Sequence, residues 1–300
     1  MDINVDDPRK IYQYKKDDRL PVCKVVNSNE LYTEYKLSFE SYVKLPEKET
    51  NIAYAHYFEA KKNNCGKLVI ILHGLGQRGR ESMFYFPPEF TKRGISSILL
   101  TLPFHNERKK YGTNDGEGFF VLDSVTMLNH FRQVIVDTRT LIDFAKNGVI
   151  KNIEEISIFG LSLGGMSAVI AMGVDERIKR GVFALSGGNI AQIFWKSLAT
   201  LPLRRYVYAV KQNYDISQEE KEYTKISRLY DPVTFGKFVK GRKVIMINGI
   251  WDPIIPRSAT NELRQSLGNP QIRYLFAGHG TIMVYRKAIA RKIAAFLLKK

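Results

Sequence analysis

The sequence predicts an α/β fold, with a mostly parallel, twisted sheet, antiparallel strands at the amino terminus and helices on both faces. Two observations support this prediction. Residues 31–45 alternate between apolar and polar side chains, whereas later segments such as 67–74 are continuously apolar and have helical patterns between most of them. Alternation is typical of strands with one face in water, and apolar runs are typical of strands covered on both faces. Apolar strands that alternate with helices imply a parallel sheet with right-handed crossovers.

The elements follow in order along the chain. Residues 31–45 and 52–60, on either side of a turn at Pro46, predict antiparallel strands, and no element is assigned to the first thirty residues. Apolar residues at helical spacing predict a helix from Met127 that stops at Gly148, and another over the last twenty residues. Six apolar runs predict buried strands: 67–74, 95–103, 154–160, 181–188, 242–249 and 271–279.

Residues 189–241 are too long for a simple connection between two strands. They hold an aromatic-rich helical segment and then a polar one, and they begin at the carboxyl edge of the sheet, where open α/β sheets bind ligands. We therefore predict a helical, cap-like insertion at 189–241 within a single domain that spans residues 1–300.

Composition excludes several classes of protein. The chain has 46 Lys and Arg against 30 Asp and Glu, a net charge of +16, but the basic residues are spread and no nucleic-acid motif accompanies them. Cys23 and Cys65 fit no metal or redox spacing, no apolar run reaches the length of a membrane span, and the amino terminus has no secretory h-region. We expect a cytoplasmic protein with a solvated basic surface and no stable membrane insertion, and the sequence predicts no oligomeric state.

The stretch ISIFGLSLGGMSAV, residues 156–169, places Ser162 between Gly160 and Gly164 where a strand becomes a helix. This is the G-x-S-x-G pattern in the strand–turn–helix context that it requires. A serine at so tight a turn adopts a strained backbone conformation, and side chains two residues away would collide with the turn. The turn exposes the hydroxyl and directs the first amides of the helix at a bound group. The alternative is a glycine–serine turn without chemistry.

A serine hydroxyl is a weak nucleophile, which needs a base, and the base needs an acid to orient it. His279 is the only histidine after Ser162, and it follows the last predicted strand. Asp252 follows the strand at 242–249 and is the predicted acid. Asp231 competes for that role, although Asp-Pro more often starts a turn.

Backbone amides complete the predicted site. The amide of Leu163, directly after the serine, and that of Leu75 are expected to bind an oxyanion. The segment 74–79 also matches G-x-G-x-x-G, a nucleotide-binding pattern, but the next strand ends without the acidic residue that would hold a ribose. His73 is expected to brace this loop rather than to act as a base.

Pocket walls are harder to assign. His105 follows a strand end, so it is a candidate pocket residue, with a structural role as the open alternative. The aromatic candidates, each of which could instead belong to the core, are Phe119, Phe120, Phe194, Trp195 and Trp251.

The order of antiparallel strands, His-Gly loop, serine turn, insertion, acid loop and terminal histidine resembles the α/β-hydrolase superfamily over residues 31–300, most of all its carboxylesterase, acetyl-esterase and dienelactone-hydrolase-like branches. The resemblance implies a serine esterase that acts on a small-molecule ester through Ser162, His279 and Asp252 without a metal or organic cofactor. The glycine pair after the serine also occurs in prolyl-oligopeptidase-like peptidases. An aminopeptidase or acylaminoacyl hydrolase on the same triad, and a non-catalytic binding protein on the same fold, remain alternatives.

Overall fold

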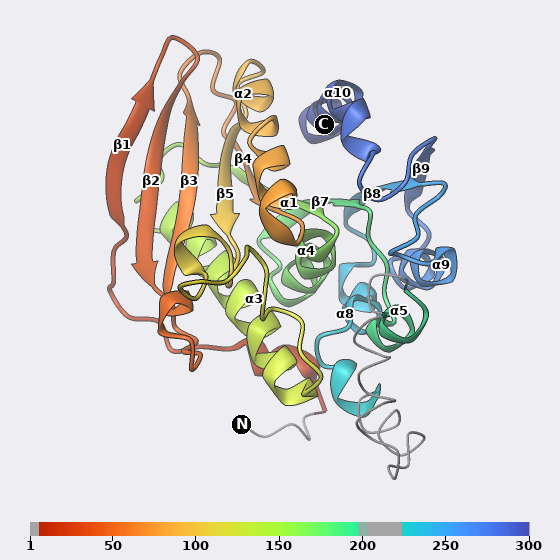
Figure 1. Ribbon diagram of the computed structural model, residues 1–300. Coiled ribbons are helices and arrows are strands. Elements are labelled where there is room, and N and C mark those ends of the chain that lie inside the picture. Colours follow the sequence, from red (N-terminus) through yellow and green to blue (C-terminus); the bar gives the residue numbers. More distant parts are fainter. Residues whose placement is uncertain (1–5, 198–200, 202–223, 300) are drawn as a thin grey trace.

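The computed structural model describes residues 6–197, 201 and 224–299. In this part of the chain nine strands form one mixed sheet, and helices cover both of its faces (Figure 1). The predicted α/β fold class is therefore confirmed. From one edge to the other, the strands are β1 (Val22–Ser28), β2 (Tyr32–Glu40), β3 (Ile52–Ala60), β5 (Ser96–Thr101), β4 (Lys67–Leu72), β6 (Glu155–Leu161), β7 (Ile178–Ala184), β8 (Lys243–Gly249) and β9 (Gln271–Leu275).

The strands at the amino-terminal edge are antiparallel, as predicted, and β3 joins the rest of the sheet by pairing antiparallel to β5. The neighbouring pairs from β5 through β9 are parallel. Strand β1 was not predicted. All of its residues are exposed, so it lacks the burial pattern that identifies a strand in a sequence. Its register with β2 also shifts between Val25 and Asn27.

Two apolar cores lie on the two faces of the sheet. In β4, Ile70 and Leu72 belong to one core and Val69 and Ile71 to the other, as the alternation of a strand requires. The first core includes residues of α3 (Ser124–Lys146), α4 (Leu163–Val174), α8 (Pro232–Val239) and α9 (Arg257–Ser266). The second includes residues of α1 (Gly76–Met83), α2 (Phe86–Thr91) and α10 (Arg286–Leu298).

The shorter helices whose bounds lie within the described ranges are η1 (Pro8–Tyr12), η2 (Lys48–Asn51), η3 (Asn106–Arg108), α5 (Ile190–Lys196) and η5 (Ile282–Tyr285). The predicted helix from Met127 is α3, which begins earlier because Asp123 caps it and ends just before the expected stop at Gly148. Among the helices of the described residues, none combines the length and the apolar composition that crossing a bilayer requires.

The predicted insertion at 189–241 includes a helix, α8, that belongs to the helical layer of the fold. Residues 198–200 and 202–223 lie outside the described residues, so the cap itself stays a prediction. At its far end, α8 is a crossover helix between β7 and β8 that packs against α4. A Cβ atom on Gly173 of α4 would lie 2.9 Å from Cβ of Phe235 in α8. Residues 232–239 are therefore part of the helical layer rather than of a cap.

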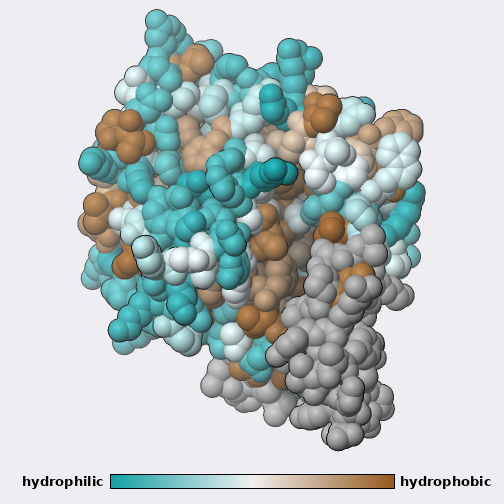
Figure 2. Space-filling view, in the orientation of Figure 1, coloured by the Kyte–Doolittle hydropathy of each residue, from teal (hydrophilic) through white to brown (hydrophobic). Residues whose placement is uncertain are grey.

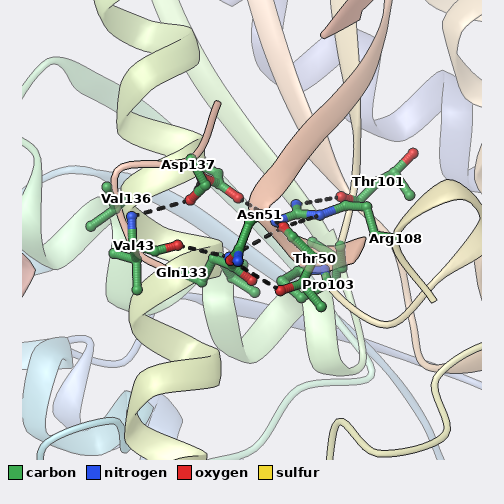
Figure 3. Close-up of polar contacts among 12 residues, drawn as sticks. Val43, Thr50, Asn51, Thr101, Pro103, Arg108, Gln133, Val136 and Asp137 are labelled. Atoms are coloured by element: carbon green, nitrogen blue, oxygen red, sulfur yellow. Dashed lines mark hydrogen bonds and ion pairs between the residues drawn. The ribbon is translucent and has the colours of Figure 1, made fainter. Parts of the chain in front are cut away.

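A buried ion pair between α3 and the loop after β5 joins segments that are distant in the sequence (Figure 3). Arg108 Nη2 lies 2.8 Å from Asp137 Oδ2, and both side chains are fully buried. Arg108 also donates to the carbonyl oxygens of Thr50 and Thr101, and Asp137 accepts from Ser41 Oγ. Burial raises the pKa of the Asp137 carboxyl and lowers that of the Arg108 guanidinium. The pair and its hydrogen bonds attach the loop after β5 to α3 and to the segment before β3.

Replacing Arg108 by Met should test this attachment. The change leaves the Asp137 carboxylate buried without its partner, so we expect the free energy of unfolding to fall by about 3–5 kcal/mol. Urea denaturation followed by circular dichroism measures the loss. The double variant Arg108→Met/Asp137→Leu should recover part of it, because no unpaired charge remains. Equal stability of Arg108→Met and the parent protein would contradict a stabilising role for the pair.

Candidate active site

Ser162 lies at the turn between β6 and α4 in a backbone conformation that residues with side chains rarely adopt. Its φ is 54° and its ψ is −115°. The turn is held by backbone hydrogen bonds on both sides, from Ser162 N to Ala184 O at 2.8 Å and from Met166 N to Ser162 O at 2.9 Å. The strained serine turn that the sequence predicts is therefore present.

Glycines flank the turn because neighbouring backbone occupies the space that a side chain would need. A Cβ atom on Gly160 would lie 2.1 Å from Gly164 O, and one on Gly164 would lie 2.1 Å from Leu72 O. At the next position, a Cβ atom on Gly165 would lie 1.9 Å from Ser186 Oγ. The obstacles thus include β4 and the chain after β7, beyond the turn itself. These contacts bring α4 close to the ends of three strands.

The structure brings Ser162, His279 and Asp252 into one hydrogen-bonded chain. His279 Nε2 lies 2.8 Å from Ser162 Oγ, and His279 Nδ1 lies 2.8 Å from Asp252 Oδ2. An ionised carboxylate only accepts hydrogen bonds, so Nδ1 carries the ring proton beside Asp252. Nε2 then has its lone pair free to accept the hydrogen bond from the serine hydroxyl.

The carboxylate of Asp252 is itself held in place. Its Oδ1 accepts hydrogen bonds from the amides of Ile254 at 2.9 Å and Ile255 at 3.0 Å, and its side chain is nearly buried. Trp251 N donates to Ala277 O, which ties the loop after β8 to the loop after β9. The acid and the histidine are therefore fixed to each other by backbone as well as by side chains.

Asp231, the competing acid, is engaged elsewhere. It precedes α8 as its N-cap and accepts hydrogen bonds from the amides of Asn189, Ile190 and Val233. Burial raises the pKa of this carboxyl. Asp252, and not Asp231, is the carboxylate that contacts His279.

The loop after β4 packs directly against the serine turn. A Cβ atom on Gly74 would lie 3.6 Å from Cβ of Ser162, and one on Gly79 would lie 2.7 Å from Gly74 O. The glycines of the G-x-G-x-x-G pattern thus allow α1 and its loop to approach the serine. The amide of Leu163 is the first of α4 and has no acceptor within its own helix. Leu75 and Leu163 both line the cavity described below.

His105 does not line the cavity. Its ring is fully buried behind the loop, where Nε2 accepts a hydrogen bond from Gly76 N at 2.9 Å and Nδ1 donates to Pro103 O at 2.8 Å. Burial lowers the pKa of this imidazole. His105 therefore orients the peptide that follows Leu75, which is the structural alternative for this residue.

His73 has a similar place. Its Nε2 accepts from Leu102 N at 3.0 Å, its Nδ1 donates to Gly74 O at 2.7 Å, and its ring packs edge-on against His105. Burial holds the pKa of His73 well below its usual range. Both rings are neutral with both nitrogens engaged, so neither is available as a base.

A cavity of about 660 Å³ opens over Ser162 and His279. Its described walls are predominantly apolar, and Figure 2 shows a hollow with hydrophobic side chains near the middle of this face. Sequence reasoning missed most of these walls, although a pair of isoleucines directly after the acid in DPIIP was a usable signal. The main aliphatic wall residues are Leu185, Ile190, Ile193, Ile254, Ile255 and Met283.

The aromatic candidates divide. Phe120 lines the cavity, whereas Phe119 is fully buried in the core. Trp251 is 63% exposed, its ring is tilted against that of Phe276, and it does not line the cavity. Trp195 belongs to α5, but its side chain and that of Phe194 lie outside what the structure describes. In the described part of the chain, no group of three or more His, Cys, Asp or Glu residues is arranged to hold a metal ion.

Comparison with known proteins identifies the fold. No protein-family model matches the sequence, and no curated protein matches it. Among solved structures, an acetyl xylan esterase from a Thermoanaerobacterium species is 17% identical, with a TM-score of 0.69 over 98% of this chain and 94% of that one. An acetyl xylan esterase from a Paenibacillus species is 14% identical, with a TM-score of 0.69 over 96% and 92%.

A third similar structure is an acylaminoacyl peptidase from Pyrococcus horikoshii. It is 16% identical, with a TM-score of 0.60 over 88% of this chain but only 40% of the peptidase. The TM-scores show that these neighbours have the same overall fold as this chain. The chain therefore has the α/β-hydrolase fold, as the resemblance in its sequence implied.

The packing of α1 on the serine loop can be tested with Gly79→Ala. The new methyl group would overlap Gly74, so we expect the free energy of unfolding to fall by roughly 1–3 kcal/mol in a denaturant titration. Gly280→Ala is the control, because no atom lies within 4 Å of a Cβ at that position. A Gly79→Ala protein as stable as Gly280→Ala would show that the loop accommodates a methyl group at position 79.

Proposed function

We propose that this protein is a serine hydrolase that cleaves carboxylic esters through a covalent acyl-enzyme. The observation that carries the proposal is the hydrogen-bonded chain from Asp252 through His279 to Ser162, opening into an apolar cavity. A non-catalytic binding protein would need neither of the two contacts in this chain. The esterases among its structural neighbours also support the proposal.

In the first half of the reaction, Ser162 Oγ attacks the ester carbonyl carbon while its proton passes to His279 Nε2. Asp252 stabilises the imidazolium that forms, through the hydrogen bond to Nδ1. The carbonyl oxygen becomes an oxyanion, to which the amides of Leu163 and Leu75 donate. When the tetrahedral intermediate collapses, the alcohol leaves with the proton from Nε2 and the acyl group remains on Oγ.

In the second half, a water molecule takes the place of the alcohol. His279 Nε2 removes a proton from the water, whose oxygen attacks the acyl carbon. Collapse of this second intermediate returns the proton to Ser162 Oγ and releases the carboxylic acid. Every proton moves through one imidazole, so we propose that the reaction uses no metal or organic cofactor.

The cavity favours an ester over the substrate of an aminopeptidase. An aminopeptidase has to hold the free ammonium group of its substrate, which calls for an acidic side chain or other acceptors near the serine. No acidic residue lines the cavity in the described ranges of the chain. Aliphatic walls suit an apolar acyl or alcohol group instead. Hydrolysis of an acylated, uncharged amino terminus stays the second candidate, because an acylaminoacyl peptidase shares the fold.

We also propose a cytoplasmic location for the enzyme. Cys23 and Cys65 are both free thiols, which suits the reducing conditions of the cytoplasm. We propose that residues of the 189–241 insertion cover the cavity, since α5 at its start already contributes Ile190 and Ile193 to the wall. The partner of the site is then a small-molecule ester rather than a nucleic acid.

Ser162→Ala tests the nucleophile. Removing Oγ should lower kcat for para-nitrophenyl acetate by about a millionfold, because no group remains to form the acyl-enzyme. A fluorophosphonate probe should label the parent protein and leave Ser162→Ala unlabelled, while both keep the same melting temperature. Turnover near the parent rate in the variant would overturn the mechanism, and a parent protein that neither labels nor hydrolyses esters would favour a binding function.

Asp252→Asn and Asp231→Asn form a matched pair. An amide at 252 no longer fixes the ring proton on Nδ1, so kcat should fall by roughly ten-thousandfold with little change in substrate binding. An amide at 231 has one acceptor oxygen in place of two, so the buried amide of Ile190 loses its partner and stability should fall by about 1–3 kcal/mol with kcat retained. Steady-state kinetics and melting temperatures of both variants separate the two roles. Loss of kcat in Asp231→Asn alone would reverse the assignment.

A further inference from the structure

One charged side chain in the cavity has no part in the proposed mechanism. Arg78, in the first turn of α1, lines the cavity together with Ser162 and His279. Among the described lining residues, only Arg78 and His279 can carry a charge. A guanidinium stays protonated under all physiological conditions, so Arg78 brings a permanent positive charge to an otherwise neutral, largely apolar space.

The guanidinium of Arg78 is open to a ligand. It is exposed, and it makes no hydrogen bond, ion pair or ring contact with any residue in the described parts of the chain. Other arginines are paired with carboxylates, as Arg19 is with Asp17 and Arg177 with Asp175. Arg80, two residues further along α1, lies over the ring of Phe84. The described part of the cavity offers Arg78 no acidic partner.

Helix stability does not account for a cation at this position. The first turn of a helix carries the positive end of its dipole, so a positive side chain there is mildly unfavourable. The first turn of α1 contains no acidic residue that would offset the charge of Arg78. A cation at this position therefore slightly destabilises the helix. It favours the binding of an anion, because the guanidinium and the helix N-terminus both attract negative charge.

Arg78 also stands at the right place relative to the reacting atoms. It follows Leu75, whose amide is a proposed oxyanion donor, by a single helical turn. The loop that carries both packs against the serine turn, with the Cβ position of Gly74 only 3.6 Å from Cβ of Ser162. A substrate with its carbonyl at Ser162 can therefore extend a second polar group to Arg78 within the same small cavity.

We propose that Arg78 binds a carboxylate carried by the ester substrate, so that the substrate class is anionic esters with an apolar segment between the carboxylate and the scissile bond. A single guanidinium matches a single negative charge and can bind a carboxylate through two parallel hydrogen bonds. A phosphate dianion would call for further donors, and the described walls are aliphatic. The excess of basic residues, 46 against 30 acidic ones, attracts the same ligands from a distance. This inference rests on the proposed esterase function.

The test compares two pairs of esters of matched shape. In the first pair the acyl group differs: para-nitrophenyl hemiglutarate carries a carboxylate, and its partner carries an isopropyl group in that place. In the second pair the alcohol differs: para-hexanoyloxybenzoate against para-isopropylphenyl hexanoate. The quantity measured is kcat/KM for the anionic ester divided by that for the neutral one, in each pair. The pair that responds tells which side of the ester bond carries the carboxylate.

Arg78→Gln should lower this ratio by about 10- to 100-fold in at least one pair, the range for loss of a hydrogen-bonded charge. Arg78→Lys should lower it less, because the charge stays but the paired donors do not. Arg291→Gln is the matched control. Arg291 is exposed on α10, outside the cavity, and its replacement removes the same net charge. Its ratio should equal that of the parent protein.

Two outcomes would overturn the inference while leaving the esterase intact. One is an unchanged ratio in Arg78→Gln for both pairs, with the neutral esters still hydrolysed. The other is an equal fall in Arg78→Gln and Arg291→Gln that disappears at high ionic strength, which would assign the effect to the overall charge. A parent protein that hydrolyses none of the four esters and does not react with a fluorophosphonate would instead contradict the proposed function.

Discussion

Three segments of backbone meet around Ser162 with no space for a side chain between them. The end of β6, the first turn of α4 and the end of β4 approach so closely that a Cβ atom on Gly160 or Gly164 would overlap a carbonyl oxygen. This close approach keeps Ser162 at a positive φ, since a relaxed turn would separate β6 from α4. The position of His279, the loop after β4 and the cavity walls all depend on where this turn holds the hydroxyl.

The surrounding side chains stabilise that geometry in layers. Asp252 holds His279 on one side of the serine, helped by the backbone hydrogen bond between the loop after β8 and the loop after β9. On the other side of the serine, His105 orients the peptide after Leu75. His105 belongs to the loop after β5, and Arg108 in that loop pairs with Asp137 of α3. The neutral, buried state of His105 is what allows its Nε2 to accept from an amide. A buried charge pair thus supports a neutral hydrogen bond next to the cavity.

The sequence predicted those parts of the molecule whose residues carry a local signature. Apolar runs located the buried strands, and glycine spacing located the serine turn, because each pattern can be recognised within a few consecutive residues. Strand β1 buries no residue and so has no apolar pattern in the sequence. The sequence places α8 in the insertion because nothing in it shows that this helix packs on α4. The role of His105 depends on its hydrogen bond to the amide of Gly76, and that of Arg78 on its place in the cavity wall without a partner among the described residues. Such relations appear only once the chain is folded.

The exposed edge strand has a consequence for association between molecules. An edge strand offers unpaired amides and carbonyls along one side, to which a strand of another chain can add. Here β1 carries Val22, Val25 and Val26 in water, a composition that favours such pairing. The irregular register between Val25 and Asn27 interrupts the ladder of donors and acceptors, and Lys24 places a charge in the same strand. These two features limit the extension of the sheet into aggregates.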